Sequence, residues 1–239
     1  MDHKNLKVLL LAAGYGTRLG KLTKNKPKCL IPIGGIPILG IWIKKLDKLN
    51  CKEIIINTHY LSEQVVEYVS NLKTKIKIHI EFEEELLGTA GTLLKNANYF
   101  SNSECLMIHA DNYTNLDFNK FFISHRQKPK ECLLSMVTFK SSNPKSCGIV
   151  ETNDQGVMIN FEEKPLMPKS NIANGAIYIF DNNLINFIKN NNKNQLIKDF
   201  SNDVIPLLKK RINTWHTNDY IIDIGTLENL KLAMNLNED

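Results

Sequence analysis

The sequence predicts an α/β fold with a mainly parallel sheet and helices on both of its faces. Strand-like and helix-like segments alternate over the first half of the chain, which is the order that parallel sheets require. A glycine-rich segment follows the first expected strand, where open α/β sheets bind ligands. The length of 239 residues suits one domain of this class, and we expect a single domain over residues 1–239.

The first half of the chain shows both periodicities clearly. Apolar or alternating runs predict strands at residues 7–13, 53–57, 76–80, 105–109 and 132–139. Apolar residues at helical spacing predict helices at residues 37–49, 62–72, 89–97 and 118–125. Pro37 suits a first helical turn, and Ser62 suits an N-cap.

The second half is less regular. Residues 148–151 and 157–161 flank the turn-forming residues 153–156 and predict a β-hairpin. Further strands are expected at residues 177–180, 212–216 and 220–222, and helices at residues 184–188, 204–208 and 226–236.

The segment after the first strand, LAAGYGTRLGKLTKNKPKCLIPI from residue 11 to residue 33, predicts a phosphate-binding loop. Gly14 and Gly16 would let backbone N–H groups approach phosphate oxygens closely. Arg18 and Lys28 would supply positive charge where phosphate charge accumulates. The alternative is a basic surface turn, which the density of glycines and cations disfavours.

Two common phosphate motifs do not fit this loop. The dinucleotide fingerprint needs a third glycine at the position of Leu19, and Gly20 stands one residue late. The Walker A pattern fails because Gly20-Lys21 is followed by Leu22. The sequence therefore indicates a phosphate loop of another kind.

Two aspartates follow apolar runs and are candidate metal ligands. A carboxylate fixed by a strand end suits Mg²⁺ held together with substrate phosphates, and Asp111 and Asp223 both stand at such positions. Asp111 could instead be a turn or cap residue. Asp223 could be a cap near the last helix, although Thr226 could fill that role.

Three further segments could contact a substrate. In the segment after the expected strand at residues 157–161, Lys164 could neutralise a phosphate and Glu163 could accept hydrogen bonds from sugar hydroxyls, or the two could belong to a solvated charge cluster. The Gly88-Thr89 segment could lie beside a base, or begin a helix with Thr89 as cap. Asn174 could bind a hydroxyl group or belong to a turn.

Composition narrows the functional class. The net charge of +5 is mild and the lysines are scattered, so we expect no nucleic-acid partner. The five cysteines lack metal or disulfide spacing, which favours reduced thiols. No signal peptide opens the chain, and the longest uncharged stretch, residues 29–43, is broken by prolines. We therefore expect a cytoplasmic protein without membrane insertion.

Taken together, these motifs closely resemble the sugar-1-phosphate nucleotidylyltransferases, over nearly the whole chain and in the family's order. The resemblance rests on residues 11–28, 88–91, Asp111, 163–165, 174–175 and 223–226. It implies a single Rossmann-like, three-layer domain with a mixed, mostly parallel central sheet. It also implies that a nucleoside triphosphate and a sugar 1-phosphate react to give a nucleotide sugar and pyrophosphate.

The resemblance also implies residue roles. The catalytic residues would be Arg18, Lys28, Asp111 and Asp223, of which Asp111 and Asp223 would bind Mg²⁺. The nucleotide would be bound by Leu11, Ala12, Ala13, Gly14, Gly16, Thr17, Arg18, Gly88 and Thr89. The sugar phosphate would be bound by Gly148, Glu163, Lys164 and Asn174. The chain departs from the family at Lys21 and at Glu85-Leu86-Leu87, where prolines are common.

Several functions remain open at this point. The preferred substrates are GTP and a mannose- or heptose-type sugar 1-phosphate, because the Gly88–Gly91 segment looks like that of guanylyltransferases. A uridylyl- or thymidylyltransferase acting on another sugar is an alternative, as is a cytidylyltransferase acting on phosphocholine. A nucleotide-sugar sensor without activity is a different class. A glycosyltransferase would typically carry an Asp-x-Asp motif, which is absent near Asp111. A homo-oligomer is compatible with the sequence.

Overall fold

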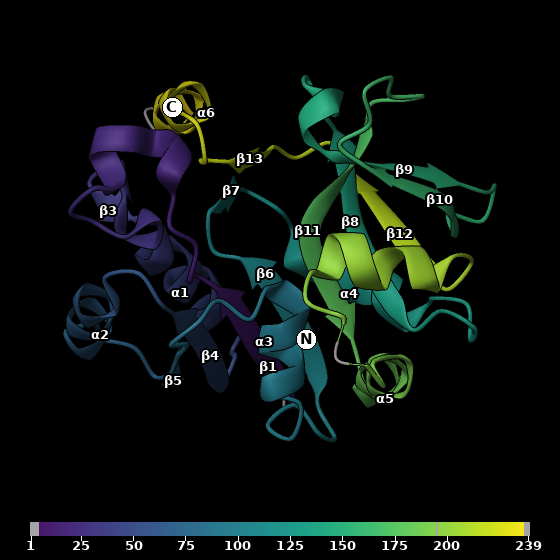
Figure 1. Cartoon of the computed structure of the whole chain (residues 1–239), viewed down its shortest axis with the longest axis horizontal. Coiled ribbons are helices and arrows are strands. Elements are labelled where there is room, and N and C mark those ends of the chain that lie inside the picture. Colours follow the sequence, from purple (N-terminus) through teal and green to yellow (C-terminus); the bar gives the residue numbers. More distant parts are fainter. Residues whose placement is uncertain (1–4, 195, 237–239) are drawn as a thin grey trace. The chain divides into compact units, whose positions relative to one another are not determined.

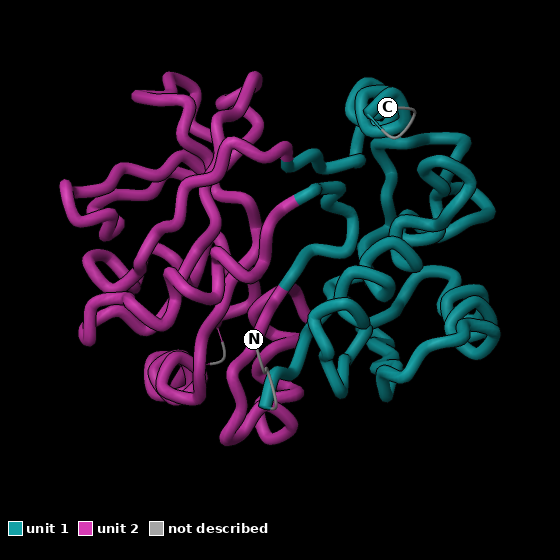
Figure 2. The backbone as a smooth tube through the Cα atoms, turned by 180° about the vertical axis from the view of Figure 1, so that it is seen from behind, with its two compact units in different colours: residues 1–86, 108–115, 221–239 teal, residues 87–107, 116–220 magenta. Residues whose placement is uncertain are grey.

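A computed structural model describes residues 5–194 and 196–236 of the chain (Figure 1). The chain forms two compact units that are interleaved along the sequence (Figure 2). Unit 1 comprises Met1–Leu86, Ile108–Asn115 and Ile221–Asp239, and unit 2 comprises Leu87–Met107 and Leu116–Tyr220. The expectation of one nucleotidyltransferase domain over residues 1–239 stays a prediction, and residues 1–4 and 237–239 lie outside the described part.

Unit 1 contains three parallel strands with helical crossovers, β1 (Leu6–Leu11), α1 (Ile38–Lys48), β4 (Glu53–Thr58), α2 (Ser62–Ser70) and β5 (Lys77–Phe82) (Figure 1). β4 pairs with β1 on one side and with β5 on the other. The central residues of β1 and β4 are buried, which explains their uninterrupted apolar sequences. This parallel arrangement brings the carboxyl ends of the three strands to the same end of the sheet.

The rest of unit 1 consists of short strands, 3₁₀ helices and one further α-helix. They are the 3₁₀ helices η1 (Thr17–Thr23) and η2 (Lys28–Leu30), the hairpin β2 (Pro32–Ile33) and β3 (Ile36–Pro37), the strands β7 (Asn112–Thr114) and β13 (Ile221–Asp223), and the helix α6 (Leu227–Asn235). β13 pairs with β7 in antiparallel orientation. The chain thus returns to unit 1 after leaving it for about a hundred residues.

Unit 2 is built around a mixed sheet of β8 (Leu134–Lys140), β9 (Gly148–Thr152), β10 (Met158–Glu163), β11 (Ile172–Phe180) and β12 (Ile212–Thr217). β12 is parallel to β8, whereas β8, β9 and β10 take part in antiparallel pairs. β6 (Glu104–His109) begins in unit 2 and ends in unit 1.

The helices of unit 2 are α3 (Thr89–Lys95), α4 (Phe118–Arg126) and α5 (Asn182–Asn191), with the shorter η3 (Pro144–Ser146), η4 (Phe200–Val204) and η5 (Ile205–Leu208). Asp117 caps α4 and Asp181 caps α5 through side-chain hydrogen bonds. Buried aromatic side chains, among them Phe121, Phe122 and Phe180, fill the core of this unit.

The predicted α/β class with a mixed, mostly parallel central sheet is confirmed. The predicted hairpin is present as β9 and β10. Two local predictions were wrong. Ser62 is not the N-cap of α2, because the cap is Leu61 in the left-handed conformation. β11 begins at Ile172, five residues earlier than expected. The helix expected at residues 204–208 is present as the last residue of a π-helical turn followed by a 3₁₀ helix.

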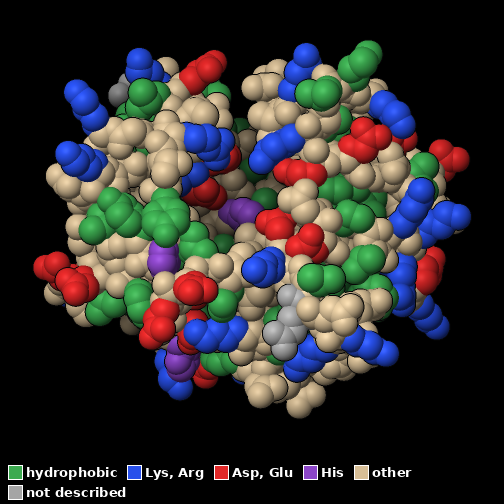
Figure 3. All heavy atoms as spheres, viewed as in Figure 1, with side chains coloured by type: hydrophobic (Ala, Val, Ile, Leu, Met, Phe, Trp, Pro, Cys, Tyr) green, Lys and Arg blue, Asp and Glu red, His purple; other side chains and the backbone are tan. Residues whose placement is uncertain are grey.

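Within the described residues, no helix has both the length and the apolar character that crossing a bilayer demands. On the face that Figure 3 shows, lysine and arginine side chains are interspersed with aspartate and glutamate side chains.

Candidate functional site

The loop after β1 is held by hydrogen bonds from the neighbouring strands. The Ala12 N–H donates to Asn57 Oδ1 over 2.7 Å, and Asn57 Nδ2 donates to Glu83 Oε1 over 3.0 Å. Asn57 and Glu83 are both buried. The start of the loop is therefore tied to the ends of β4 and β5, which sequence reasoning did not foresee.

The two predicted loop glycines differ in what they require. Gly16 has φ +67°, and a Cβ atom there would lie 2.9 Å from Thr23 Cγ2 and 3.0 Å from Lys28 Cβ. A side chain at this position is therefore disfavoured by both backbone conformation and space. Gly14 has no neighbouring heavy atom within 4 Å of such a Cβ, so a side chain would find open space there.

A second set of contacts braces the outer part of the same loop. The Tyr15 hydroxyl lies 2.7 Å from His59 Nε2, and Tyr60 donates to the carbonyl oxygen of Lys24 over 2.6 Å. Gln64 donates to the carbonyl oxygen of Asn25 over 3.0 Å. His59, Tyr60 and Gln64 lie at or near the start of α2, so this part of the chain positions the loop.

Four charged side chains predicted from the sequence meet at the edge of unit 1. Lys28 Nζ lies 2.5 Å from Asp111 Oδ2 and 2.8 Å from Asp223 Oδ1. Arg18 Nη2 lies 3.2 Å from Asp223 Oδ2. The side chain of Lys28 is only 9 % exposed, whereas that of Arg18 is 63 % exposed and can turn toward a ligand.

The pairing of β7 with β13 explains how the two carboxylates come together. Asp223 is paired with Asn112 across the two strands, and the Ile224 N–H donates to the Asp111 carbonyl oxygen over 3.0 Å. The hydroxyl of Thr226 caps α6 by accepting from the Asn229 N–H. The carboxylate of Asp223 is thereby free of a capping role for α6 and can face Lys28.

Gly225 lies within the motif at residues 223–226, but the sequence analysis assigned it no role in the site. Its N–H donates to Asp223 Oδ1 over 2.8 Å. A Cβ atom at this position would lie 2.6 Å from Arg18 Nη2, 2.8 Å from Asp223 Oδ1 and 2.9 Å from Lys28 Nζ. The space around the carboxylates is therefore crowded by charged groups, which would have to shift to admit a side chain at this position.

The environment stabilises the charged forms of Lys28 and of Asp223. Burial acts to lower the pKa of Lys28, but the negative charges of Asp111 and Asp223 outweigh it and raise the pKa above its ordinary value of 10.5. Burial acts to raise the pKa of Asp223, but Lys28, Arg18 and the Gly225 N–H together hold it below its ordinary value of 3.8.

These residues fit a divalent cation of the magnesium type. Carboxylate oxygens are hard ligands, and one oxygen each of Asp111 and Asp223 faces a single positively charged atom. Among the described residues, no group of three or more His, Cys, Asp and Glu side chains forms a metal site. Mg²⁺ commonly uses one or two protein carboxylates and completes its coordination with phosphates and water.

The predicted sugar-phosphate residues lie in unit 2, and three of them are neighbours. Glu163 at the end of β10 is paired with Gly148 at the start of β9, and a Cβ atom on Gly148 would lie 2.7 Å from Glu163 Oε2. Lys164 Nζ is 3.6 Å from Glu163 Oε1, and its backbone has φ +47°. This conformation turns the chain sharply after the strand.

Asn174 and the Gly88-Thr89 segment have the structural roles that the sequence left open as alternatives, a turn at Asn174 and a helix start at Gly88-Thr89, although the cap of α3 is Gly88 and not Thr89. Asn174 accepts from the Ala176 N–H and donates to the Tyr178 hydroxyl within a β-bulge of β11. Thr89 donates to Asp199 and accepts from the Phe200 N–H. A Cβ atom on Gly88 would lie 2.5 Å from the Lys198 carbonyl oxygen, so close packing requires glycine there.

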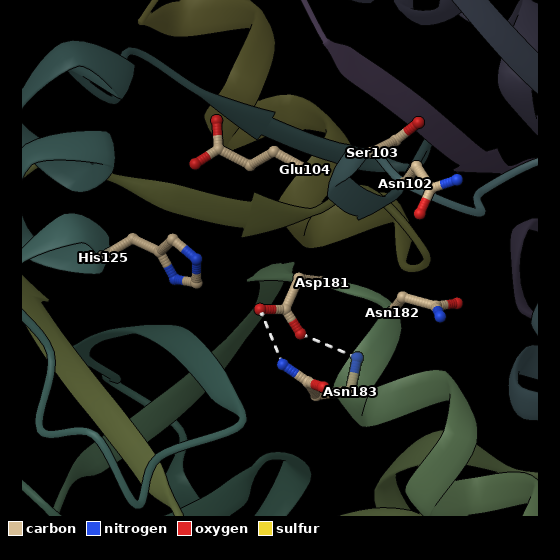
Figure 4. Close-up of a pocket in the computed structure, with 7 residues that line it drawn as sticks. All are labelled: Asn102, Ser103, Glu104, His125, Asp181, Asn182 and Asn183. Atoms are coloured by element: carbon tan, nitrogen blue, oxygen red, sulfur yellow. Dashed lines mark hydrogen bonds between the residues drawn. The ribbon is translucent and has the colours of Figure 1, made fainter.

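A cavity of about 340 Å³ in unit 2 contains none of the predicted site residues (Figure 4). It is lined by Asn102, Ser103, Glu104, His125, Asp181, Asn182 and Asn183. His125 Nδ1 lies 2.8 Å from Ser135 Oγ, and Asp181 accepts two hydrogen bonds from Asn183 as the cap of α5. Burial, with the nearby charges of Lys128 and Arg126, lowers the pKa of His125 to about 3.

Comparison with known proteins places the chain in a family. The family model described as "Nucleotidyl transferase" matches residues 7–239, and the chain belongs to this family. The resemblance to sugar-1-phosphate nucleotidyltransferases is thereby confirmed at the level of the family.

Curated relatives are similar over most of the chain. A protein of Sulfolobus acidocaldarius named "Putative mannose-1-phosphate guanyltransferase" is 31 % identical over 77 % of this chain and 50 % of its own length. A glucose-1-phosphate adenylyltransferase of Bacillus cereus is 28 % identical over 93 % of this chain and 65 % of its own length. The chain thus spans about half to two thirds of the length of these relatives.

Two solved structures show the same fold. A "Putative Glucose-1-Phosphate Thymidylyltransferase" of Bacillus anthracis, in complex with a sucrose, has a TM-score of 0.82 at 23 % identity, covering 98 % of this chain and 96 % of its own. HddC of Yersinia pseudotuberculosis, complexed with GMP-PN, has a TM-score of 0.79 at 24 % identity, covering 97 % and 99 %.

Proposed function

We propose that the protein joins the nucleoside monophosphate of a nucleoside triphosphate to a sugar 1-phosphate and releases pyrophosphate. The observation that carries this proposal is the cluster of Lys28, Arg18, Asp111 and Asp223, in which Lys28 lies against Gly16 of the glycine loop. Such a cluster suits a reaction in which polyanions must be brought together. Membership of the nucleotidyl transferase family supports the same reaction class.

The reaction asks for positioning and charge rather than a covalent intermediate. A phosphate oxygen of the sugar 1-phosphate is already a nucleophile, so it can attack the α-phosphorus without a general base. Bringing the two reactants into line can contribute roughly 7–11 kcal/mol to the lowering of the barrier. The backbone N–H groups at Gly14 and Gly16, with Thr17 and Arg18, bind the triphosphate in this proposal, beside Leu11, Ala12 and Ala13.

Charge at the reacting centre comes from the cluster in unit 1. Lys28 and Arg18 stabilise the negative charge that develops on the departing pyrophosphate. Asp111 and Asp223 would hold Mg²⁺, which neutralises phosphate charge when it is bound. Gly88 and Thr89 lie beside the base, and Gly148, Glu163, Lys164 and Asn174 bind the sugar phosphate. The side chain of Asn174 would contact the sugar only by exchanging a bulge hydrogen bond for one to a hydroxyl group.

For the substrates, we favour GTP and a mannose- or heptose-type sugar 1-phosphate. The name of the relative from Sulfolobus acidocaldarius and the GMP-PN complex of HddC support a guanine nucleotide. The adenylyl- and thymidylyltransferase names of other similar proteins keep a different base as the second candidate.

A substrate matrix tests the proposal directly. Each of GTP, ATP, UTP, dTTP and CTP is combined with mannose, heptose and glucose 1-phosphates and with phosphocholine, in the presence of Mg²⁺, and pyrophosphate is measured. Release that requires both a triphosphate and a sugar 1-phosphate supports the proposed class. Turnover only with CTP and phosphocholine would assign the alternative reaction, and nucleotide binding without pyrophosphate release would indicate a sensor.

A further inference from the structure

Binding a phosphate does not require a lysine to be paired with carboxylates, yet Lys28 is paired with two of them. Its ammonium group lies between two carboxylates, with one oxygen of Asp111 at 2.5 Å and one of Asp223 at 2.8 Å. The two aspartates are 83 and 195 residues from Lys28 in the sequence, so the arrangement is a product of the tertiary fold.

The backbone fixes this placement. Lys28 follows Pro27 and begins η2, and its Cβ lies against Gly16. Its side chain is 9 % exposed, whereas those of Asp111 and Asp223 are 29 % and 43 % exposed. A partly buried ammonium with two charged acceptors forms strong hydrogen bonds, so the lysine is held firmly at the carboxylates.

Lys28 Nζ contacts one oxygen of Asp111 and one of Asp223, the two carboxylates assigned to the divalent cation in the proposed function. Two carboxylates that share one cation repel each other when that cation is removed. The space around them is also crowded, since Arg18 Nη2, Asp223 Oδ1 and Lys28 Nζ all lie within 3 Å of the Cβ position on Gly225. A divalent cation and the Lys28 ammonium therefore compete for the same two carboxylates.

We propose that Lys28 is a positioning residue that holds Asp111 and Asp223 as a preformed pair of metal ligands and competes with the divalent cation for them. Lys28 would release the carboxylates when a divalent cation binds there, and its ammonium group would then be available to the triphosphate. This inference rests on the proposed function, because it assumes that Asp111 and Asp223 bind the metal. Lys28 thus opposes metal binding although it supports turnover.

The test measures metal affinity without nucleotide or turnover. Binding of Mn²⁺ alone to the full-length protein is followed by electron paramagnetic resonance for the wild type, Lys28→Met and Lys28→Gln. Both substitutions remove the competing charge, and we expect the Kd for Mn²⁺ to fall at least about tenfold. Lys26→Met, which removes an exposed lysine from the same loop, is expected to leave the Kd unchanged.

Asp111→Asn separates failure of this inference from failure of the metal assignment. If Asp111→Asn binds Mn²⁺ as the wild type does, the metal is not held at this site and the assignment in the proposed function is wrong. If Asp111→Asn loses the ion but both Lys28 variants bind it equally or more weakly than the wild type, the competition is refuted and the assignment stands. Reduced turnover together with tighter Mn²⁺ binding is a combination that general misfolding does not produce.

A measurement on the wild type keeps the inference testable if the Lys28 variants do not fold. The ¹H–¹⁵N resonance of a lysine ammonium group in a firm ion pair is observable by NMR. Addition of Mg²⁺ should shift or broaden the resonance of Lys28, and Asp111→Asn should abolish that response. A Lys28 resonance that stays constant while Mg²⁺ binds at Asp111 would overturn the proposal.

Discussion

Single residues set the electrostatics of the candidate site. Lys28 is buried between two carboxylates, whereas the pair of Arg18 with Asp223 is largely exposed. Exposed ion pairs add little to stability, so we expect Arg18 to contribute little to folding. The ion pairs of Lys28 differ, because this lysine is buried and loses the compensation of its charge when a carboxylate is removed.

We therefore predict large losses of turnover from single substitutions in the cluster. Asp111→Asn, Asp223→Asn and Lys28→Ala should each lower kcat by at least about a hundredfold, the scale of losing one preorganised charge contact. The measurement is pyrophosphate release with the substrate pair that the matrix identifies. Lys26→Ala is the control, and near-normal kcat in all three cluster variants would contradict the proposed mechanism.

The loop glycines allow a matched pair of substitutions. Gly16→Ala should lower the free energy of unfolding by about 1–3 kcal/mol, because the left-handed backbone at φ +67° and the contact with Thr23 both oppose a methyl group. Gly14→Ala should leave stability nearly unchanged, since its surroundings are open. Urea denaturation measures both, and equal losses would show that the two glycines are not distinguished by conformation.

Among the elements, the connection from β13 to α6 both stabilises the start of the helix and holds a residue of the candidate site. Thr226 caps α6, and the Asn229 side chain donates to the Asp223 carbonyl oxygen over 2.8 Å. The start of the helix therefore holds the backbone of a predicted catalytic residue. The sequence indicated the cap, because threonine precedes an apolar periodic segment with Glu228 in the first turn.

Loss of this cap should affect stability more than chemistry. Thr226→Ala is expected to lower the free energy of unfolding by about 1 kcal/mol, whereas Thr226→Ser should retain most of it. Turnover should fall by less than in Asp223→Asn, because the carboxylate itself remains. Chemical denaturation and pyrophosphate release test the two parts separately, and a full loss of turnover in Thr226→Ala would give the hydroxyl a direct role in the site.

The packing of α4 against β8 buries an imidazole whose ionisation should be visible in stability. His125 is 5 % exposed, and its pKa is lowered to about 3. The unfolded chain gains a proton near pH 6.5 while the folded chain does not, so stability is present above pH 6.5 and is lost as the pH falls toward 3. Between pH 7 and pH 5 the expected loss from this group is about 1–2 kcal/mol.

His125→Gln should flatten that part of the pH profile. Glutamine can still bond to Ser135 but does not titrate, so the slope between pH 7 and pH 5 should decrease. His216→Gln, at an exposed position, is the control. If the slope of the unfolding free energy against pH were the same in His125→Gln as in the wild type, this histidine would not contribute to the loss of stability between pH 7 and pH 5.

At the scale of the whole molecule, the cysteines report on packing. All five are free, with Cys147 partly exposed and Cys29, Cys51, Cys105 and Cys132 buried. Burial raises the pKa of Cys29 and of Cys51 to about 12, which keeps these thiols protonated and unreactive.

We expect one thiol of the five to react quickly with a thiol-specific disulfide reagent in the folded protein. The other four should react only after denaturation, and a reducing agent should not change Tm. Cys147→Ser should remove the fast phase. Several fast thiols in the native protein would show that the buried cysteines become accessible.

Much of the fold could be predicted locally. The runs of β1 and β4, the hairpin of β9 and β10, and most helices follow from periodicity and turn residues, as the sequence predicts. The exceptions have tertiary causes. β11 begins early because Asn174 stabilises a bulge that lets the strand continue. α2 starts without a side-chain cap because Leu61 takes the left-handed conformation.

The sequence by itself determined the class of fold, the glycine loop, and which carboxylates and cations to examine, because these depend on residue type and spacing over short distances. Only the tertiary structure decided that Lys28 lies between Asp111 and Asp223, that Gly225 is crowded by three charged groups, and that Tyr15 meets His59. The side-chain contacts of Lys28 and Tyr15 among these join residues from 44 to 195 positions apart, and such long-range pairing leaves no local signature.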